Sequence, residues 1–194
     1  MSDDKARLFL AIDIPKSIRS VLYDLGRSGL AGSTGLKWVE ESNIHLTLKF
    51  LGDVSRSQID AIQDVLEDIT CPDSIGLEIR GLGIFGNLRR PRVLWAGVSG
   101  DIEALRLLHQ EVEDKCARLG FDRDVMEYRP HVTLARFKES FADTPSLRRL
   151  LGANNDVSLG SFIAESMVLY QSTLLPSGPV YTPVKTFNLT ENKD

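Results

Sequence analysis

The chain has 194 residues, of which 42% are hydrophobic and 26% charged, a composition that excludes a disordered or low-complexity chain. Its net charge of −4 argues against a general nucleic-acid binder, because such proteins neutralise many phosphates with an excess of Lys and Arg. Any contact with a nucleic acid is therefore expected to be local, and one compact domain over residues 1–194 is the expected organisation.

Two features of the sequence bear on where the protein works. The first apolar run, Leu8–Ile14, is interrupted by Asp13 and followed by Pro15, which argues against a signal peptide and a membrane span. Cys71 and Cys116 show no CxxC spacing and no adjacent histidine, so neither a zinc site nor a disulfide framework is predicted. These features indicate a cytoplasmic protein with no membrane partner.

Hydrophobic periodicity predicts strands alternating with amphipathic helices. In chain order the expected elements are a strand at 7–14, a helix at 18–25, strands at 36–39 and 44–51, a helix at 59–69, strands at 75–84 and 93–98, a helix at 102–119, a strand at 128–137, a short helix at 145–151, and strands at 157–159, 162–170 and 180–189. The pattern predicts an α+β fold with mostly antiparallel sheets covered by helices.

A short internal repeat is the most informative feature of the sequence. His45-Leu-Thr47-Leu and His131-Val-Thr133-Leu both read His-x-Thr-Leu, and the chain contains only three histidines. The probability that two of three histidines show this pattern by chance is roughly one in ten thousand at typical residue frequencies. In a strand, the His and Thr of each copy share one face. If two such strands are related by a pseudo-twofold axis, their polar faces converge on one cleft.

Two imidazoles in one cleft are suited to acid/base chemistry near neutral pH, because the ordinary pKa of histidine is about 6.5. One neutral imidazole removes a proton from water while one protonated imidazole donates to the leaving oxygen. Thr47 and Thr133 can donate hydrogen bonds to phosphate oxygens. Lys49 continues the face of the first motif, and Arg136 follows the second, where strict alternation turns it away unless a bulge redirects it. The pattern indicates an anionic reactant.

Other chemistries have less support in the sequence. Catalytic zinc usually takes three protein ligands, and neither motif offers a carboxylate or thiolate on its histidine face, so no metal is expected. The third histidine, His109, lacks the x-Thr-Leu neighbours and is expected to be structural. The basic loop Arg89–Arg92 has two open interpretations, steering of an RNA end or a solvated loop, whereas Trp95 is expected in the core.

With both motifs in view, the chain resembles the two-histidine phosphoesterase superfamily, and within it the RNA 2′,3′-cyclic phosphodiesterase family, also called 2′-5′ RNA ligases. The matching segments are residues 7–12, 45–52, 85–86, 90–95, 129–136 and 170–181. The resemblance implies a bilobed, pseudo-symmetric fold whose antiparallel sheets line a central cleft, with helices on the outside. It also implies that no cofactor or metal is needed.

The resemblance further implies hydrolysis of an RNA or nucleotide 2′,3′-cyclic phosphate to a 2′-phosphomonoester, with reversible 2′-5′ ligation in some members. By resemblance, His45 donates a proton to O3′ and His131 accepts one from water, while Thr47, Thr133 and Arg136 hold the phosphate. A monomer acting on an RNA 3′ end or a nucleotide is expected. Two alternatives stay open, namely a non-catalytic module that binds a terminal phosphate, and the same chemistry on another cyclic phosphate.

Overall fold

The computed structural model describes residues 5–69, 74–176 and 178–189. Its elements in chain order are β1 (Lys5–Asp13), α1 (Lys16–Gly29), β2 (Leu36–Trp38), the 3-10 helix η1 (Glu41–Asn43), β3 (His45–Ser55), α2 (Arg56–Leu66), β4 (Ile75–Asn87), β5 (Arg90–Gly100), α3 (Ile102–Arg118), β6 (His131–Phe137), α4 (Thr144–Ala153), β7 (Ser158–Ala164), β8 (Ser166–Leu175) and β9 (Gly178–Asn188). The predicted alternation of strands and helices is confirmed, although several boundaries differ.

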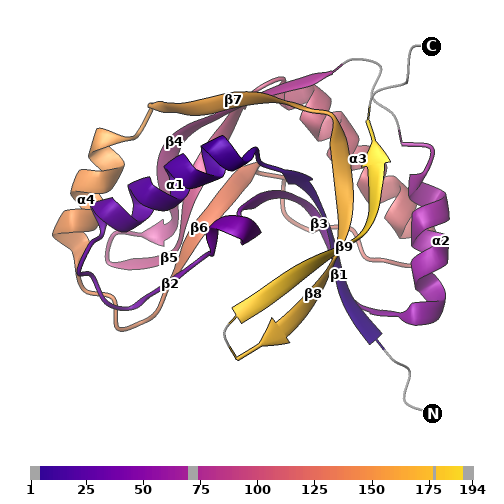
Figure 1. Ribbon diagram of the computed structural model, residues 1–194, viewed down its shortest axis with the longest axis horizontal. Coiled ribbons are helices and arrows are strands. Elements are labelled where there is room, and N and C mark those ends of the chain that lie inside the picture. Colours follow the sequence, from indigo (N-terminus) through magenta and orange to yellow (C-terminus); the bar gives the residue numbers. More distant parts are fainter. Residues whose placement is uncertain (1–4, 70–73, 177, 190–194) are drawn as a thin grey trace.

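The described strands form one curled sheet in which each strand pair is antiparallel. The strand order is β7-β4-β5-β6-β3-β1-β8-β9, and β2 pairs with β6 outside this path. The two halves, β7-β4-β5-β6 and β3-β1-β8-β9, meet through the single register pair Leu46 and Val132. Because so little backbone joins them, the halves splay apart (Figure 1). The predicted α+β class is confirmed.

Helices pack in two pairs on the outside of the two halves (Figure 1). α1 contacts α4 and β7, while α2 contacts α3 and both of them contact β3. The buried residues of α1 recur four residues apart, at Ile18, Leu22 and Gly26, so one stripe faces the core. A Cβ added at Gly26 would lie 2.8 Å from the ring of Trp38. The absent side chain therefore lets β2 pack directly against α1, which brings β2 to the edge of the cleft.

The expected loop at residues 85–92 is instead a tight hairpin. β4 runs on to Asn87 and β5 begins at Arg90, because the Asn87 side-chain oxygen accepts hydrogen bonds of 2.9 Å from the backbone N–H groups of Arg89 and Arg90. The exposed arginines of this hairpin do not line the cleft described below. Trp95 packs against Phe85 with ring centroids 5.6 Å apart. Phe85 also meets the ring of His131 edge-on, with ring centroids 4.8 Å apart, so the base of this hairpin contacts the second motif.

The cysteines and helices bear on two other expectations. Cys116 is fully buried on α3, and burial raises the pKa of its thiol to about 11. Cys71 lies outside the described residues. Within the described ranges, none of the helices combines the length and apolar character needed to cross a bilayer.

Candidate active site

The two histidine motifs lie on adjacent strands where the halves of the sheet meet. Leu46 of β3 and Val132 of β6 are paired, and both are fully buried. In an antiparallel pair, residues on either side of such a pair project to the opposite face. The side chains on that opposite face are those of His45, Thr47, His131 and Thr133. The structure therefore brings together the two motifs that the sequence predicted would converge.

Both imidazoles are oriented by the same backbone contact. The Nδ1 atom of His45 lies 2.7 Å from the carbonyl oxygen of Asn43, and Nδ1 of His131 lies 2.7 Å from the carbonyl oxygen of Arg129. A carbonyl oxygen only accepts, so Nδ1 carries the proton in both rings. Nε2 is then the atom that gains or loses a proton. In His45 this atom lies 3.0 Å from Oγ1 of Thr47.

The ring of His45 is enclosed by aromatic side chains. Its centroid lies 5.0 Å from the Phe9 ring and 5.4 Å from the Tyr181 ring, which meets it edge-on. Burial among these rings lowers the pKa of His45 below its ordinary value of 6.5, since it disfavours the charged form. The Asn43 carbonyl and the Asp13 carboxylate partly oppose this shift. The charge of the second motif histidine also lowers the pKa, so the two imidazoles are electrostatically coupled.

Each motif strand carries a β-bulge at the last residue of its motif. The pairing of β3 with β1 skips Leu48, and the pairing of β6 with β5 skips Leu134. One extra residue reverses the alternation of side chains beyond it. As a result, Lys49 and Ala135, which directly follow the bulges, both turn to the buried face. The two bulges repeat the pseudo-symmetry of the motifs.

The predicted position of Lys49 in the cleft is therefore wrong. Its side chain is only 1% exposed, and Nζ lies 2.6 Å from Oε1 of Glu113 on α3 and 2.9 Å from the carbonyl oxygen of Asp122. The strand alternation that placed Lys49 beside Thr47 fails at the intervening bulge. Lys49 forms a buried ion pair behind the strand and does not reach the cleft.

The bulge in β6 has the opposite consequence for Arg136. Strict alternation turned this residue away, but the extra residue at Leu134 returns it to the cleft, which it lines together with Thr133. The corresponding position in β3 is Phe50, which also lines the cleft and is 64% exposed. The residue two positions after each bulged leucine therefore lines the cleft. This residue is the cation Arg136 in β6 and the aromatic Phe50 in β3.

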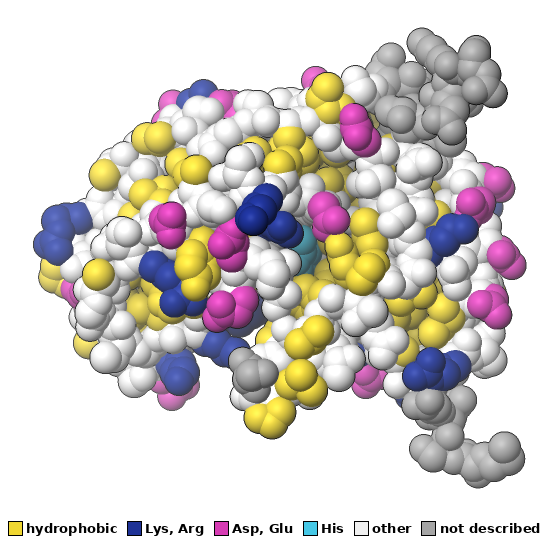
Figure 2. Space-filling view, viewed as in Figure 1, with side chains coloured by type: hydrophobic (Ala, Val, Ile, Leu, Met, Phe, Trp, Pro, Cys, Tyr) yellow, Lys and Arg dark blue, Asp and Glu magenta, His cyan; other side chains and the backbone are white. Residues whose placement is uncertain are grey.

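These side chains border a cleft of about 870 Å³. Figure 2 shows a histidine in a hollow, with charged side chains along one rim and hydrophobic side chains along the other. The residues that line the cleft include the charged Arg27, Lys37, Glu40 and Arg136 and the hydrophobic Phe50, Leu174, Val180 and Tyr181. His45, Thr47, Thr133 and Arg136 line the cleft. His131 is placed beside them by the pairing of β6 with β3.

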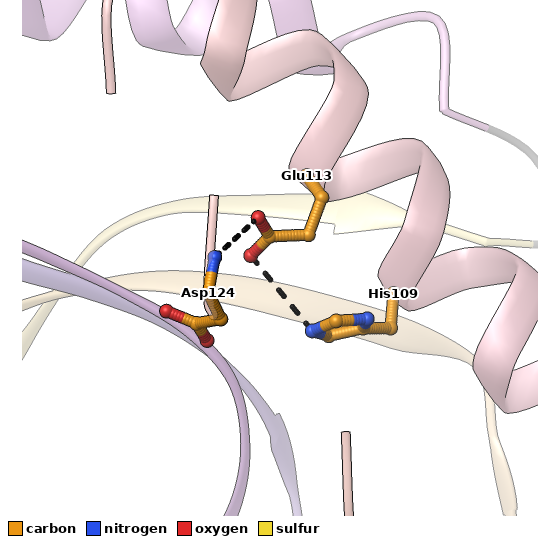
Figure 3. Close-up of side chains that lie close together, drawn as sticks. All are labelled: His109, Glu113 and Asp124. Carbon is orange, nitrogen blue, oxygen red and sulfur yellow. Dashed lines mark hydrogen bonds and ion pairs between the residues drawn. The ribbon is translucent and has the colours of Figure 1, made fainter. Parts of the chain in front are cut away.

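Within the described residues, one cluster has side chains of the kinds that bind metals (Figure 3). Potential ligand atoms of His109, Glu113 and Asp124 lie within 4.8 Å of one another. However, the Lys49 ammonium lies against Oε1 of Glu113, and the Asp124 backbone N–H donates to Oε2 at 3.1 Å. The ammonium occupies the place of a cation, so the cluster is an ion-pair network. It lies behind β3, away from the cleft.

His109 has a structural position, in line with the prediction. Its ring stacks on Tyr128 at 4.0 Å with an interplanar angle of 7°. The Tyr128 hydroxyl donates a 3.0 Å hydrogen bond to the carbonyl oxygen of Thr47. The side chains behind β3 therefore hold the backbone of the first motif from the face opposite the cleft.

A bilobed antiparallel sheet with a His-x-Thr motif from each half at its central cleft is the architecture of a two-histidine phosphoesterase. The pattern of the family described as LigT-like phosphoesterase matches residues 12–95 and 97–181 of this chain. The chain belongs to this family.

Individual relatives agree with this assignment over most of the chain. The RNA 2′,3′-cyclic phosphodiesterase of Aeropyrum pernix is 41% identical over 146 residues, which are 75% of this chain and 82% of that protein. The protein of the same name from Methanothermobacter thermautotrophicus is 33% identical over 186 residues, covering 95% of this chain and all of that protein. The crystal structure of E. coli LigT complexed with 3′-AMP superposes with a TM-score of 0.79 at 28% identity, covering 97% of this chain and 100% of that one.

Sequence reasoning missed several residues that line the cleft. Phe50 follows Thr47 at the same distance as Arg136 follows Thr133, so an alignment of the two repeats beyond their last leucine would have found it. Tyr181 and Lys37 come from segments that carry no motif. Only the strand pairing shows that these segments border the cleft.

Proposed function

We propose that this protein hydrolyses the 2′,3′-cyclic phosphate of an RNA end or a nucleotide to a 2′-phosphomonoester, using two histidines and no metal. The observation that carries the proposal is the convergence of the two His-x-Thr motifs on one face at the junction of the half-sheets. The names of the relatives support this choice of substrate. Incubation with adenosine 2′,3′-cyclic phosphate should yield adenosine 2′-monophosphate, and recovery of unchanged, bound nucleotide would indicate a binding module instead.

In the proposed reaction, water attacks phosphorus while the bond from phosphorus to O3′ breaks. His131 takes a proton from the water through Nε2, and His45 gives a proton to the departing O3′ through its own Nε2. Thr47, Thr133 and Arg136 hold the non-bridging oxygens, since hydroxyls and a guanidinium donate to developing negative charge. If the 5′-hydroxyl of a second RNA attacks phosphorus in place of water while the bond from phosphorus to O3′ breaks, the same two proton transfers would give a 2′-5′ phosphodiester, which is the ligation reaction.

The environment of His45 couples its protonation to substrate binding. Burial lowers its pKa in the empty cleft, so the ring is mainly neutral at pH 7. A phosphate anion beside Nε2 stabilises the imidazolium and raises the pKa. His45 is therefore protonated to a greater extent when the substrate is bound, and this is the proton that it gives to the leaving oxygen.

The pH dependence of kcat/KM is expected to be bell-shaped, with its acidic limb below pH 6.5. Two imidazoles in opposite protonation states are required, and the lower of their two pKa values sets the acidic limb. Burial places the pKa of His45 below 6.5, so the lower of the two imidazole pKa values also lies below 6.5. Initial rates with adenosine 2′,3′-cyclic phosphate across pH 4.5–9 test this expectation. An acidic limb at or above pH 6.5 would contradict the described environment of His45.

Activity is expected to be unchanged in EDTA. The motif residues are two histidines and two threonines, and Glu113, in the cluster with His109 and Asp124, already binds the Lys49 ammonium. The measurement is the turnover rate before and after exhaustive chelation, followed by addition of Zn²⁺, Mg²⁺ or Mn²⁺. Loss of activity that a divalent cation restores would replace this mechanism with metal-assisted hydrolysis.

A further inference from the structure

Lys37 has an unusual neighbour among the residues that line the cleft. In the antiparallel pairing of β2 with β6 it lies directly opposite Arg136. Directly opposed residues project from the same face, with Cβ atoms about 4.5–5.5 Å apart. Both side chains are exposed and both line the cleft. Two cations thus lie side by side above the reaction site.

Folding alone gives no reason for this pair. Like charges directly opposite each other destabilise a sheet. The neighbouring Arg27 has its Nη2 atom 3.4 Å from Oε1 of Glu40 and lies over the Tyr23 ring, so its charge has partners. Over the described part of the chain, neither Lys37 nor Arg136 forms an ion pair or a side-chain hydrogen bond. An uncompensated pair of cations in a concave site attracts an anion.

The cleft also has room for more than the reacting group. Its volume of about 870 Å³ lies near the upper end of the roughly 300–1,000 Å³ that ligand pockets occupy. Its lining includes His45 and Thr47 of β3, Arg136 of β6 and Lys37 of β2. β2 pairs with β6 only at Ala135–Phe137, beyond the second motif, so Lys37 lies beside Arg136 and not beside the motif residues.

Building on the proposed function, we propose that Lys37 forms a second anion subsite, which binds the phosphodiester on the 5′ side of the terminal nucleotide. Arg136 then lies between this phosphodiester and the cyclic phosphate. The preferred substrates are accordingly oligonucleotides with a cyclic phosphate end, and cyclic mononucleotides, which lack this phosphodiester, are poorer ones.

The test compares adenosine 2′,3′-cyclic phosphate with the dinucleotide ApA that ends in a 2′,3′-cyclic phosphate. Wild-type protein is expected to show a kcat/KM about tenfold higher for the dinucleotide, which is the effect of one charge-assisted contact. Lys37→Ala should remove most of this preference through KM, and Lys37→Arg should retain it. The logarithmic salt slope for the dinucleotide should fall by about 0.7 in Lys37→Ala, as expected for one lost phosphate contact on a single strand.

Lys16→Ala is the matched control, because Lys16 is an exposed lysine on α1 that does not line the cleft. This variant should keep the wild-type preference. Lys37→Ala should also show no loss of thermal stability, since it removes a like-charge contact, whereas a merely structural lysine would lower the melting temperature. Equal loss of kcat/KM for both substrates, or no wild-type preference for the dinucleotide, would overturn the proposal.

Product binding separates failure of the subsite from failure of the proposed reaction. Titration calorimetry with adenosine 2′-monophosphate and with ApA 2′-monophosphate needs no turnover. The subsite predicts that Lys37→Ala weakens only the dinucleotide, by about tenfold. If wild-type protein hydrolyses neither substrate but this difference in binding is seen, the proposed reaction fails and the subsite stands. Equal weakening of both products, or of neither, rejects the subsite whatever the turnover.

Discussion

Replacing His45 or His131 with alanine is expected to lower the turnover of adenosine 2′,3′-cyclic phosphate by about 10²–10⁴-fold, the usual contribution of one general acid or base. In each ring Nε2 is the nitrogen that can exchange a proton with the substrate, because Nδ1–H donates to a backbone carbonyl oxygen. Each variant removes one proton-transfer step while leaving the buried partners of the strand, Leu46 and Val132, in place. Single-turnover rates at saturating nucleotide measure the effect on the chemical step.

The chain supplies its own control for these variants. His109 is the third histidine, and it stacks on Tyr128 behind β3 rather than in the cleft. His109→Ala should retain the turnover number of the folded wild-type protein. The double variant of His45 and His131 should lose little more than the worse single variant, because residues that act as one unit are strongly non-additive. Wild-type rates in both single variants would exclude the proposed pair.

Replacing Glu113 with alanine is expected to lower the free energy of unfolding by about 3–5 kcal/mol, because it leaves a buried charge without its partner. The Lys49 side chain is 1% exposed, and its ammonium lies 2.6 Å from Oε1 of Glu113. The variant also removes the acceptor for the Asp124 backbone N–H. Equilibrium unfolding in urea, at a pH where the wild-type transition is two-state, measures the loss.

A double replacement separates loss of the ion pair from simple loss of packing. Exchanging Lys49 for methionine and Glu113 for leucine removes both charges while keeping most of the volume, and such replacements are often neutral or stabilising. The double variant should therefore recover most of the stability that Glu113→Ala loses. If the two variants were equally destabilised, packing around α3 and not the unpaired Lys49 ammonium would account for the loss.

The sequence predicted the chemistry of the site better than its geometry. The repeat identified the four motif residues, because strand periodicity requires a His and a Thr two positions apart to share a face. The α+β class likewise follows from alternating helical and strand patterns. By contrast, the bulges at Leu48 and Leu134 could not be predicted from the residue types, because leucine fits a regular strand as well as a bulge.

Those two bulges account for the main disagreements at the site. Lys49 was expected in the cleft but is buried. Arg136 was expected to reach the cleft only if a bulge turned its side chain toward it, and it lines the cleft. Lys37 was missed because its role depends on the pairing of β2 with β6, which joins residues about a hundred positions apart. Pairing over such distances follows from the assembled sheet and cannot be read from local patterns.

The most direct test of the account is whether one phosphate contacts both motif imidazoles. The measurement is the 15N chemical shift of Nε2 in each of the three histidines, by NMR, before and after addition of adenosine 2′-monophosphate. Nε2 of His45 and of His131 should both shift, with the pKa of His45 rising in the complex, while His109 stays unchanged. A shift confined to one motif histidine, or to neither, would contradict a shared phosphate site.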